Sequence, residues 1–215
     1  MLFDFDYTLA DSSVGIIESV NWALASLGMA RQSDEAIRGT IGLSLGDTFA
    51  SLVGDAAAGA NDFTRLFIQR ADEVMAKHTV LLPGCREAVG ALSRAGYRLG
   101  VVSTKFRRRI ETVLVRDGLR EPFEVVVGGE DVPKHKPHPA CLLAAIRSLG
   151  VEAGETVYVG DSSVDGEAAS RAGMPFIAVL TGRTDESRLR AWGPVAVLPG
   201  VVDVLEWMEG RRDGG

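Results

Sequence analysis

The second half of the chain alternates short apolar runs with longer amphipathic stretches. Apolar runs bounded by glycine, proline or polar residues are typical of buried strands, whereas apolar residues that recur with the helical period are typical of helices. The predicted strands cover residues 97–103, 123–129, 156–161, 175–180 and 195–198, and the predicted helices cover residues 85–96, 139–150, 164–172 and 201–210. Strands that alternate with such helices form right-handed crossovers. We therefore expect an α/β fold with a doubly wound, Rossmann-like parallel sheet.

The N-terminus has a second kind of pattern. The chain opens MLFDFDYTLADSS, in which apolar residues alternate with the acids Asp4 and Asp6. A period of two predicts another strand and places both acids on the same side of it. At about 4 Å and an effective dielectric of about 20, two carboxylates repel each other by on the order of 4 kcal/mol. So unfavourable a pair indicates that the acids have a chemical role.

The segment that follows this strand contains helical patterns and no convincing strand. The predicted helices cover residues 14–28, 33–42, 45–54 and 61–78. A helical block between the first strand and the rest of an α/β sheet is typical of an inserted subdomain. The expected domains are an α/β core of residues 1–12 and 81–215 and a helical cap of residues 13–80. The expected hinges are Ala10–Ser13 and Val80–Gly84, and such a cap would suit a lid that closes on a small ligand.

Polar residues follow four of the predicted strands. They are Asp4–Asp6, Ser103–Lys105, Lys134–Pro137 and Gly160–Asp165. Taken singly, each could be a helix cap, a turn or a solvated side chain. In a doubly wound sheet, however, the carboxyl ends of the strands share one edge, where ligands bind. Together the four groups supply carboxylates for a hard cation, hydroxyls and amides for phosphate oxygens, and a lysine that balances the remaining charge.

This combination predicts phosphate chemistry. Mg²⁺ prefers oxygen ligands and usually keeps several waters and a substrate phosphate. Asp4, Asp6 and Asp161 would repel one another without such an ion, and a phosphate dianion could approach them with it. One acid can then attack phosphorus and form an aspartyl-phosphate. A second acid can give a proton to the leaving oxygen and later take one from the attacking water.

The four motifs DFDYTLADS, VVST, KHKPHP and GDSSVD stand in an order and spacing that resemble a known family. The resemblance is to the haloacid dehalogenase superfamily, specifically to its phosphatases with a helical C1-type cap inserted after the first strand. The resemblance covers essentially the whole chain. Within the superfamily, the sequence is most similar to phosphoglycolate phosphatases and to the inorganic pyrophosphatases of the same capped group. It implies a Mg²⁺-dependent phosphatase that acts on a small phosphorylated metabolite.

The resemblance also implies roles for the acids. Asp4 would be the nucleophile and a Mg²⁺ ligand, and Asp6 would be the general acid and base, with its backbone carbonyl on the metal. Asp161 would be a metal ligand, and Asp165 would support the metal. The family usually has glycine at the position of Tyr7, so the shape of this turn is in question.

Further residues are implied to bind the phosphate. Ser103 and the backbone amide of Thr104 would hold the transferring phosphoryl group. Lys136 is the better candidate for the conserved lysine of the third motif of the family, because it directly precedes proline, and Lys134 is the second candidate. Lys105 could contact an anionic substrate, and its alternative is a solvated helix start.

Other functions remain open on the sequence alone. A phosphosugar mutase of the β-phosphoglucomutase type would share every motif quoted above. A 2-haloacid dehalogenase attacks carbon and needs no acid at the position of Asp6, so this residue counts against it. A non-catalytic binding protein is the alternative from another class. Substrate choice should depend on the cap, where the turn Thr40–Ser44 either faces the active site or simply joins two helices.

Composition and charge exclude some classes of binding partner. The 215 residues carry a net charge of -6, with a pI near 5.2, which argues against a general nucleic-acid binder. The two cysteines lie in apolar helical contexts and are expected to be buried thiols. Asp4 and Asp6 are not typical of a signal peptide, and no apolar run approaches the ~18 residues that a membrane span requires. We expect a cytoplasmic monomer or homodimer that binds a small phosphorylated substrate and no membrane.

Overall fold

The protein forms two compact units in the computed structural model, which describes residues 1–54 and 58–212. Unit 1 consists of Met1–Ala10 and Leu81–Gly215, and unit 2 consists of Asp11–Val80. The sequence predicts boundaries after residues 12 and 80, and the units divide after Ala10 and Val80. The chain passes between the units through the short strands β2 (Ala10–Asp11) and β3 (Val80–Leu81), which form a two-stranded sheet.

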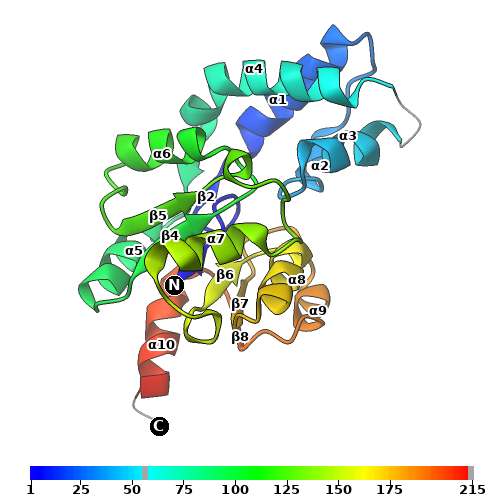
Figure 1. The fold of residues 1–215 in the computed structure, drawn as a ribbon. Coiled ribbons are helices and arrows are strands. Elements are labelled where there is room, and N and C mark those ends of the chain that lie inside the picture. Colours follow the sequence, from blue (N-terminus) through cyan, green and yellow to red (C-terminus); the bar gives the residue numbers. More distant parts are fainter. Residues whose placement is uncertain (55–57, 213–215) are drawn as a thin grey trace. The chain divides into compact units, whose positions relative to one another are not determined.

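Unit 1 is built on a six-stranded sheet with the order β5-β4-β1-β6-β7-β8 (Figure 1). All neighbouring strands in it are parallel. The strands are β1 (Leu2–Phe3), β4 (Leu99–Val102), β5 (Phe123–Val127), β6 (Tyr158–Gly160), β7 (Phe176–Val179) and β8 (Ala196–Leu198). The predicted doubly wound parallel sheet is confirmed, and β1 lies at its centre with β4 on one side and β6 on the other.

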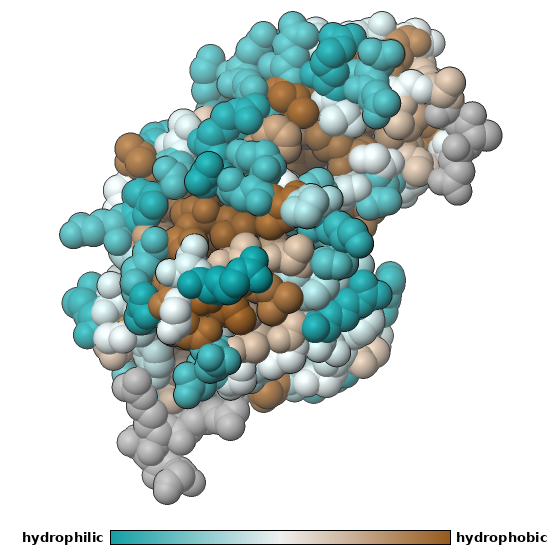
Figure 2. Space-filling view, in the orientation of Figure 1, coloured by the Kyte–Doolittle hydropathy of each residue, from teal (hydrophilic) through white to brown (hydrophobic). Residues whose placement is uncertain are grey.

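Helices flank this sheet. They are α5 (Cys85–Arg94), α6 (Arg107–Arg116), α7 (Ala140–Leu149), α8 (Ser163–Ala172), α9 (Glu186–Arg190) and α10 (Val204–Arg212). In Figure 1, α7 lies in front of the sheet, and its Leu142 and Ala145 join Leu2, Val102 and Tyr158 in one buried apolar cluster. Figure 2 shows both hydrophilic residues and several hydrophobic groups on the visible face of unit 1.

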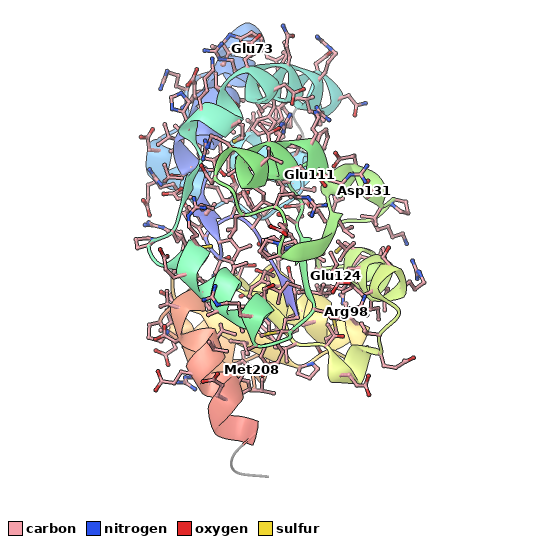
Figure 3. All side chains as sticks on the ribbon, turned by 90° about the vertical axis from the view of Figure 1, so that its left-hand side faces the viewer. Glu73, Arg98, Glu111, Glu124, Asp131 and Met208 are labelled. Atoms are coloured by element: carbon pink, nitrogen blue, oxygen red, sulfur yellow. The ribbon has the colours of Figure 1, made fainter. Side chains whose placement is uncertain are left out.

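The amino ends of the strands lie at the edge of the sheet opposite the carboxyl ends, where the polar motifs are expected. At the amino ends Arg98, just before β4, pairs with Glu124 of β5 at 2.6 Å, and both side chains are labelled in Figure 3. A cavity of about 220 Å³ at this edge is lined in part by Arg98, Leu149 and Met208. The pair is half exposed, so solvent screening keeps its contribution to stability small. None of the four polar motifs lies at this edge.

Unit 2 is helical. Its helices are α1 (Ser13–Ser26), α2 (Asp34–Arg38), α3 (Leu45–Val53) and α4 (Ala60–His78). The core lies between α1, α3 and α4, where Phe49 and Phe63 have ring centroids 5.0 Å apart and Leu24 is fully buried. The turn 40–44 joins α2 to α3.

The expectation of buried thiols is met. Cys85 and Cys141 are free, buried thiols. Among the residues that the structure describes, no helix is both long and apolar enough to cross a membrane.

Candidate active site

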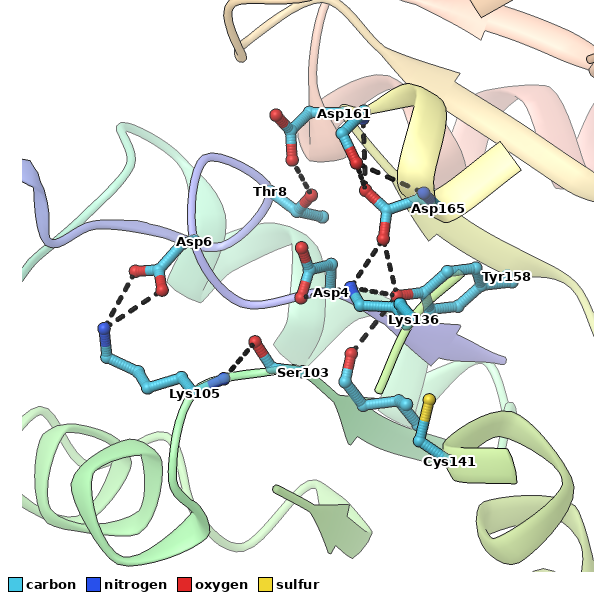
Figure 4. A network of polar contacts seen from close by, with 12 residues as sticks. Asp4, Asp6, Thr8, Ser103, Lys105, Lys136, Cys141, Tyr158, Asp161 and Asp165 are labelled. Atoms are coloured by element: carbon cyan, nitrogen blue, oxygen red, sulfur yellow. Dashed lines mark hydrogen bonds and ion pairs between the residues drawn. The ribbon is translucent and has the colours of Figure 1, made fainter. Parts of the chain in front are cut away.

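Polar side chains follow the three central strands at their carboxyl ends. Asp4 comes directly after β1, Ser103 after β4 and Asp161 after β6. Because β4, β1 and β6 are parallel neighbours, these residues share one edge of the sheet. All three are buried, with exposed fractions of 3%, 3% and 5%. Figure 4 shows them in one polar network with Lys136, which lies in the segment between β5 and α7.

Three carboxylates form a cluster in this network. Asp4, Asp161 and Asp165 each offer an oxygen within 4.8 Å of the others, and all three residues are buried. Burial raises the pKa of Asp4 to about 6; Lys136 opposes this, and the charges of Asp165 and Asp6 add to it. Burial also raises the pKa of Asp161 well above its usual value, with Asp165 and Asp4 adding to the effect. The ionised cluster is therefore strained electrostatically, as expected where a cation is to be bound.

Lys136 is the positive charge beside this cluster. Its Nζ lies 3.0 Å from Asp4 Oδ1 and donates hydrogen bonds to Asp165 Oδ1 at 2.6 Å and to the Tyr158 hydroxyl at 2.9 Å. Burial disfavours the charged lysine, but Asp165 and Asp4 outweigh it and hold the pKa of Lys136 above its usual value. Lys134 is exposed. The structure thus brings Lys136, and not Lys134, to the acids.

The contact between Asp4 and Lys136 leaves Asp4 incompletely satisfied. It is an ion pair, and Asp4 Oδ1 accepts no well-aligned hydrogen bond from the described residues although it is buried. A buried carboxylate oxygen without such a bond is energetically unfavourable. The oxygen is therefore available for a ligand or for chemistry.

Asp165 has the opposite character. Its Oδ1 accepts hydrogen bonds from Lys136 and from the Tyr158 hydroxyl at 2.9 Å, and its Oδ2 accepts from the amide of Ser162 at 3.1 Å and from the Ser162 hydroxyl. The Ser162 hydroxyl in turn accepts from the Asp165 amide, so the pair caps the start of α8. Asp165 is therefore occupied in holding Lys136 and the helix.

Asp161 is held by residues that sequence reasoning missed. The Thr8 hydroxyl donates to Asp161 Oδ1 at 3.2 Å. Gly182 lies so close that a Cβ built on it would be 1.9 Å from Asp161 Oδ2. Tyr158, which hydrogen-bonds with Lys136 and Asp165 and not with Asp161, was also missed, since a single polar group in the apolar run TVYV was the only signal for it. A glycine shortly after a strand was the corresponding signal for Gly182.

Asp6 does not lie where the strand pattern places it. Its carboxylate is outside the acidic cluster and instead accepts from Lys105 Nζ at 3.2 and 3.0 Å, one distance to each oxygen. The reason is that β1 ends at Phe3, so Asp6 belongs to the following turn and the alternation of sides no longer applies. Asp4 and Asp6 are thereby paired with different lysines (Figure 4).

Tyr7 forms the turn after Asp6. Its φ is 59°, and it is the one residue other than glycine with a positive φ in the described part of the chain. Its amide donates to the carbonyl of Ala10 at 2.6 Å, and the residue is buried. Left-handed backbone is easiest for glycine, which explains why a glycine would suit this position.

The segment Ser103–Lys105 is fixed by its backbone. The Ser103 amide donates to Val127 at 3.0 Å, and its hydroxyl accepts from the Lys105 amide at 3.3 Å. Figure 4 shows the Ser103 hydroxyl on the side of Asp4. Thr104 is partly exposed, whereas Lys105 is buried. The expectation that Lys105 starts a solvated helix therefore differs from what is observed.

Comparison with known proteins extends these observations. A model of the haloacid dehalogenase-like hydrolases matches residues 1–179. The phosphoglycolate phosphatase of Rhodospirillum rubrum is 32% identical over an alignment of 225 positions, gaps included, which covers 100% of this chain and 92% of the relative. That of Chromobacterium violaceum is 34% identical, with 88% of each chain covered. A solved haloacid dehalogenase-like hydrolase from Bacteroides fragilis superposes with a TM-score of 0.91 at 36% identity, over 94% of this chain and 97% of its own.

Proposed function

The chain belongs to the haloacid dehalogenase-like hydrolase family, and from this premise we propose that it is a Mg²⁺-dependent phosphatase. Its substrate would be a small phosphoglycolate-like phosphomonoester or pyrophosphate, hydrolysed through an aspartyl-phosphate. One observation carries the proposal: the buried Asp4 at the end of the central strand has Lys136 on one side and Asp161 on another. The two relatives described above, both phosphoglycolate phosphatases, support the same class of substrate.

Asp4 is the proposed nucleophile, and Asp6 is the proposed acid and base. An Asp4 oxygen bonds to phosphorus while the bond from phosphorus to the leaving oxygen breaks, and that oxygen takes a proton from Asp6, which enters this step in its protonated form. A water oxygen then bonds to phosphorus, the bond to Asp4 breaks, and a water proton moves to Asp6. The incompletely satisfied Asp4 Oδ1 supports the first role. The separate position of Asp6, away from the acidic cluster, supports the second.

The acidic cluster fits a divalent cation. The strained carboxylates of Asp4 and Asp161 are the candidate ligands, together with the Asp6 backbone carbonyl that the family resemblance implies. Asp165 already accepts four hydrogen bonds, so we assign it to holding Lys136 and supporting the site from outside. When bound, Mg²⁺ would neutralise the acids so that a phosphate dianion can approach.

The phosphate would be held by groups on the neighbouring strand end and by the lysine. The Ser103 hydroxyl and the Thr104 amide are the proposed donors to phosphate oxygens, and Lys136 would balance the charge that develops during transfer. Ser103 is buried beside Asp4 in the network of Figure 4, which suits this role.

A phosphate-release screen tests the proposal. We expect the protein with Mg²⁺ to release phosphate from phosphoglycolate, pyrophosphate or a related small ester, and EDTA to abolish the activity. Asp4→Asn should lower kcat by at least about 10³-fold because it removes the nucleophile, whereas Asp62→Asn, at an exposed acid of α4, should not change it. Near-normal turnover by Asp4→Asn, or turnover in EDTA, would contradict the scheme.

The same screen separates the mutase. No release from any ester, together with interconversion of a sugar 1-phosphate and 6-phosphate, would assign the site to a phosphosugar mutase instead. A dehalogenase is disfavoured because Asp6 has no task in displacement at carbon, and the buried pairing of Asp6 with Lys105 shows an acid that is specifically held.

A further inference from the structure

A second buried ion pair lies beside the acidic cluster. Lys105 Nζ donates to both carboxylate oxygens of Asp6, and the side chains of Lys105 and Asp6 are only 4% and 10% exposed. The two residues come from the segments that follow β4 and β1, which are neighbours in the sheet. Burying two charges has a large desolvation penalty that the pairing only offsets. The pair therefore adds little net stability, and a role in positioning is the better explanation.

The backbone around Lys105 is rigidly placed. The Lys105 amide donates to the Ser103 hydroxyl at 3.3 Å, and its carbonyl accepts from the Gly129 amide at 3.0 Å. A Cβ on Gly129 would lie 2.4 Å from the Thr104 carbonyl oxygen, and one on Gly128 would lie 2.2 Å from the Arg107 amide nitrogen. The two loops thus pack backbone against backbone, with no room for side chains at either glycine.

The Lys105 side chain is also held by an aromatic ring. Its Nζ lies 5.9 Å from the centroid of the Phe5 ring, an arrangement that favours a cation over the ring face. Lys136 serves Asp4 and Asp165 in the same network, so each acid of the pair Asp4 and Asp6 has its own lysine. Lys105 consequently keeps the Asp6 carboxyl turned away from the cluster in which Asp4 lies.

We propose that Lys105 is a positioning residue that acts through Asp6 and not through the substrate. It holds the Asp6 carboxyl in the orientation from which it exchanges protons with the leaving oxygen and with the attacking water. This inference rests on the proposed phosphatase function, in which Asp6 moves the proton. It replaces the expectation that Lys105 contacts an anionic substrate.

The test is a double-mutant cycle on kcat and KM. Lys105→Met keeps an unbranched side chain of similar length and removes the ammonium. With a saturating alkyl phosphate we expect kcat to fall roughly 10- to 100-fold, a part of the ~10²–10⁴-fold that acid–base catalysis contributes, with KM changed by less than about twofold. In the Asp6→Asn background the same substitution should lower kcat by less than about twofold, because Asp6 no longer needs positioning. Lys77→Met, at an exposed lysine of α4, is the matched control.

A leaving-group comparison gives a second readout. An aryl phosphate with a stable phenolate leaving group needs less protonation than an alkyl phosphate. Lys105→Met should therefore have the smaller effect on the aryl substrate, in the same proportion as Asp6→Asn does. A general structural defect would lower both rates alike, and that result would overturn the proposal.

The outcomes distinguish this inference from the proposed function. Suppose that Asp4→Asn abolishes turnover, so that the proposed function holds. If the effects of Lys105→Met and Asp6→Asn on kcat are then additive, or if Lys105→Met mainly raises KM for carboxylate-bearing substrates, Lys105 does not act through Asp6. In that case the inference about Lys105 fails and the proposed function stands. If Asp4→Asn remains active, the proposed function fails first. Should Lys105→Met not fold because Asp6 is left as a buried unpaired charge, the double variant with Asp6→Asn carries no such charge, and its comparison with Asp6→Asn still decides.

Discussion

Tyr7 is the residue whose backbone conformation fits its type least well. Its φ of 59° is left-handed, which disfavours residues with a Cβ by roughly 1–2 kcal/mol. Tyr7→Ala keeps that strain and loses the buried ring, whereas Tyr7→Gly loses the ring and relieves the strain. We expect the glycine variant to be more stable than the alanine variant by about 1 kcal/mol in urea unfolding.

A helical position at which alanine is preferred over glycine provides the control for this comparison. Gly210 lies in α10 with open space around it and no positive φ. Gly210→Ala should stabilise the protein by up to about 1 kcal/mol, because alanine is the better helix former. If alanine is also the more stable choice at position 7, the turn is not strained in solution.

At the scale of elements, the segment after β7 shapes the site through Gly182. A Cβ there would meet Asp161 Oδ2 at 1.9 Å and also lie 2.6 Å from Asp161 Cγ, so Gly182→Ala must move this proposed metal ligand. We expect the Kd for Mg²⁺, measured by calorimetry, to rise at least about tenfold, as for other changes around metal ligands. Gly154→Ala, which would meet nothing within 4 Å, should leave the affinity unchanged. Equal affinities in both variants would show that Asp161 does not bind the metal.

The elements themselves were largely predictable, because apolar periodicity depends on burial. The predicted strands at 123–129 and 175–180 correspond to β5 and β7, and the helix at 139–150 corresponds to α7. The prediction of a haloacid dehalogenase-like hydrolase is confirmed by the family match and by the curated relatives. Polar residues after strands were informative because parallel strands end at one edge.

The contacts within the site were less predictable, since they depend on which side chains meet across loops. Asp6 departs from the strand alternation because β1 ends at Phe3, and nothing in the local sequence couples it to Lys105, which is far along the chain. The contact of Gly182 with Asp161 likewise joins segments that follow two different strands. Periodicity locates such residues at an edge but does not say which of them touch.

At the scale of the whole molecule, the buried acids couple stability to pH and to metal. The pKa of Asp4 is about 6 in the folded protein and near 3.8 in the unfolded chain. Between these two pH values the folded protein therefore keeps a proton on Asp4 that the unfolded chain has released. The stability that this group contributes is present below about pH 4 and is lost as the pH rises through about 6. The raised pKa of Asp161 acts in the same direction.

Asp4→Asn removes the part of this pH dependence that comes from Asp4. In EDTA we expect the variant to gain stability over the wild-type protein as the pH is raised from 4 to 7, by on the order of 2–3 kcal/mol. Asp117 gives the opposite sign in a lower pH range, because its hydrogen bond to Arg116 lowers its pKa from 3.8. The stability that it contributes is present above about pH 4 and is lost as the pH falls below that value, so the stability deficit of Asp117→Asn should be constant from pH 4 to 7 and shrink at lower pH. Urea unfolding at a series of pH values measures both differences, and a pH-independent difference for Asp4→Asn would contradict the electrostatic account.

Mg²⁺ should restore the stability that the wild-type protein loses as the pH rises, and it should not do so in Asp4→Asn. A cation that binds only the folded state at 100 times its Kd stabilises it by about 2.7 kcal/mol, and it does so by pairing the charges that otherwise repel. We therefore expect Mg²⁺ to raise the Tm of the wild-type protein at pH 7 and to raise that of Asp4→Asn much less. Equal shifts in both proteins would place the cation elsewhere, since Asp4 contributes one of the three clustered carboxylates. Because this readout is thermal unfolding, it tests the cation site without reference to turnover.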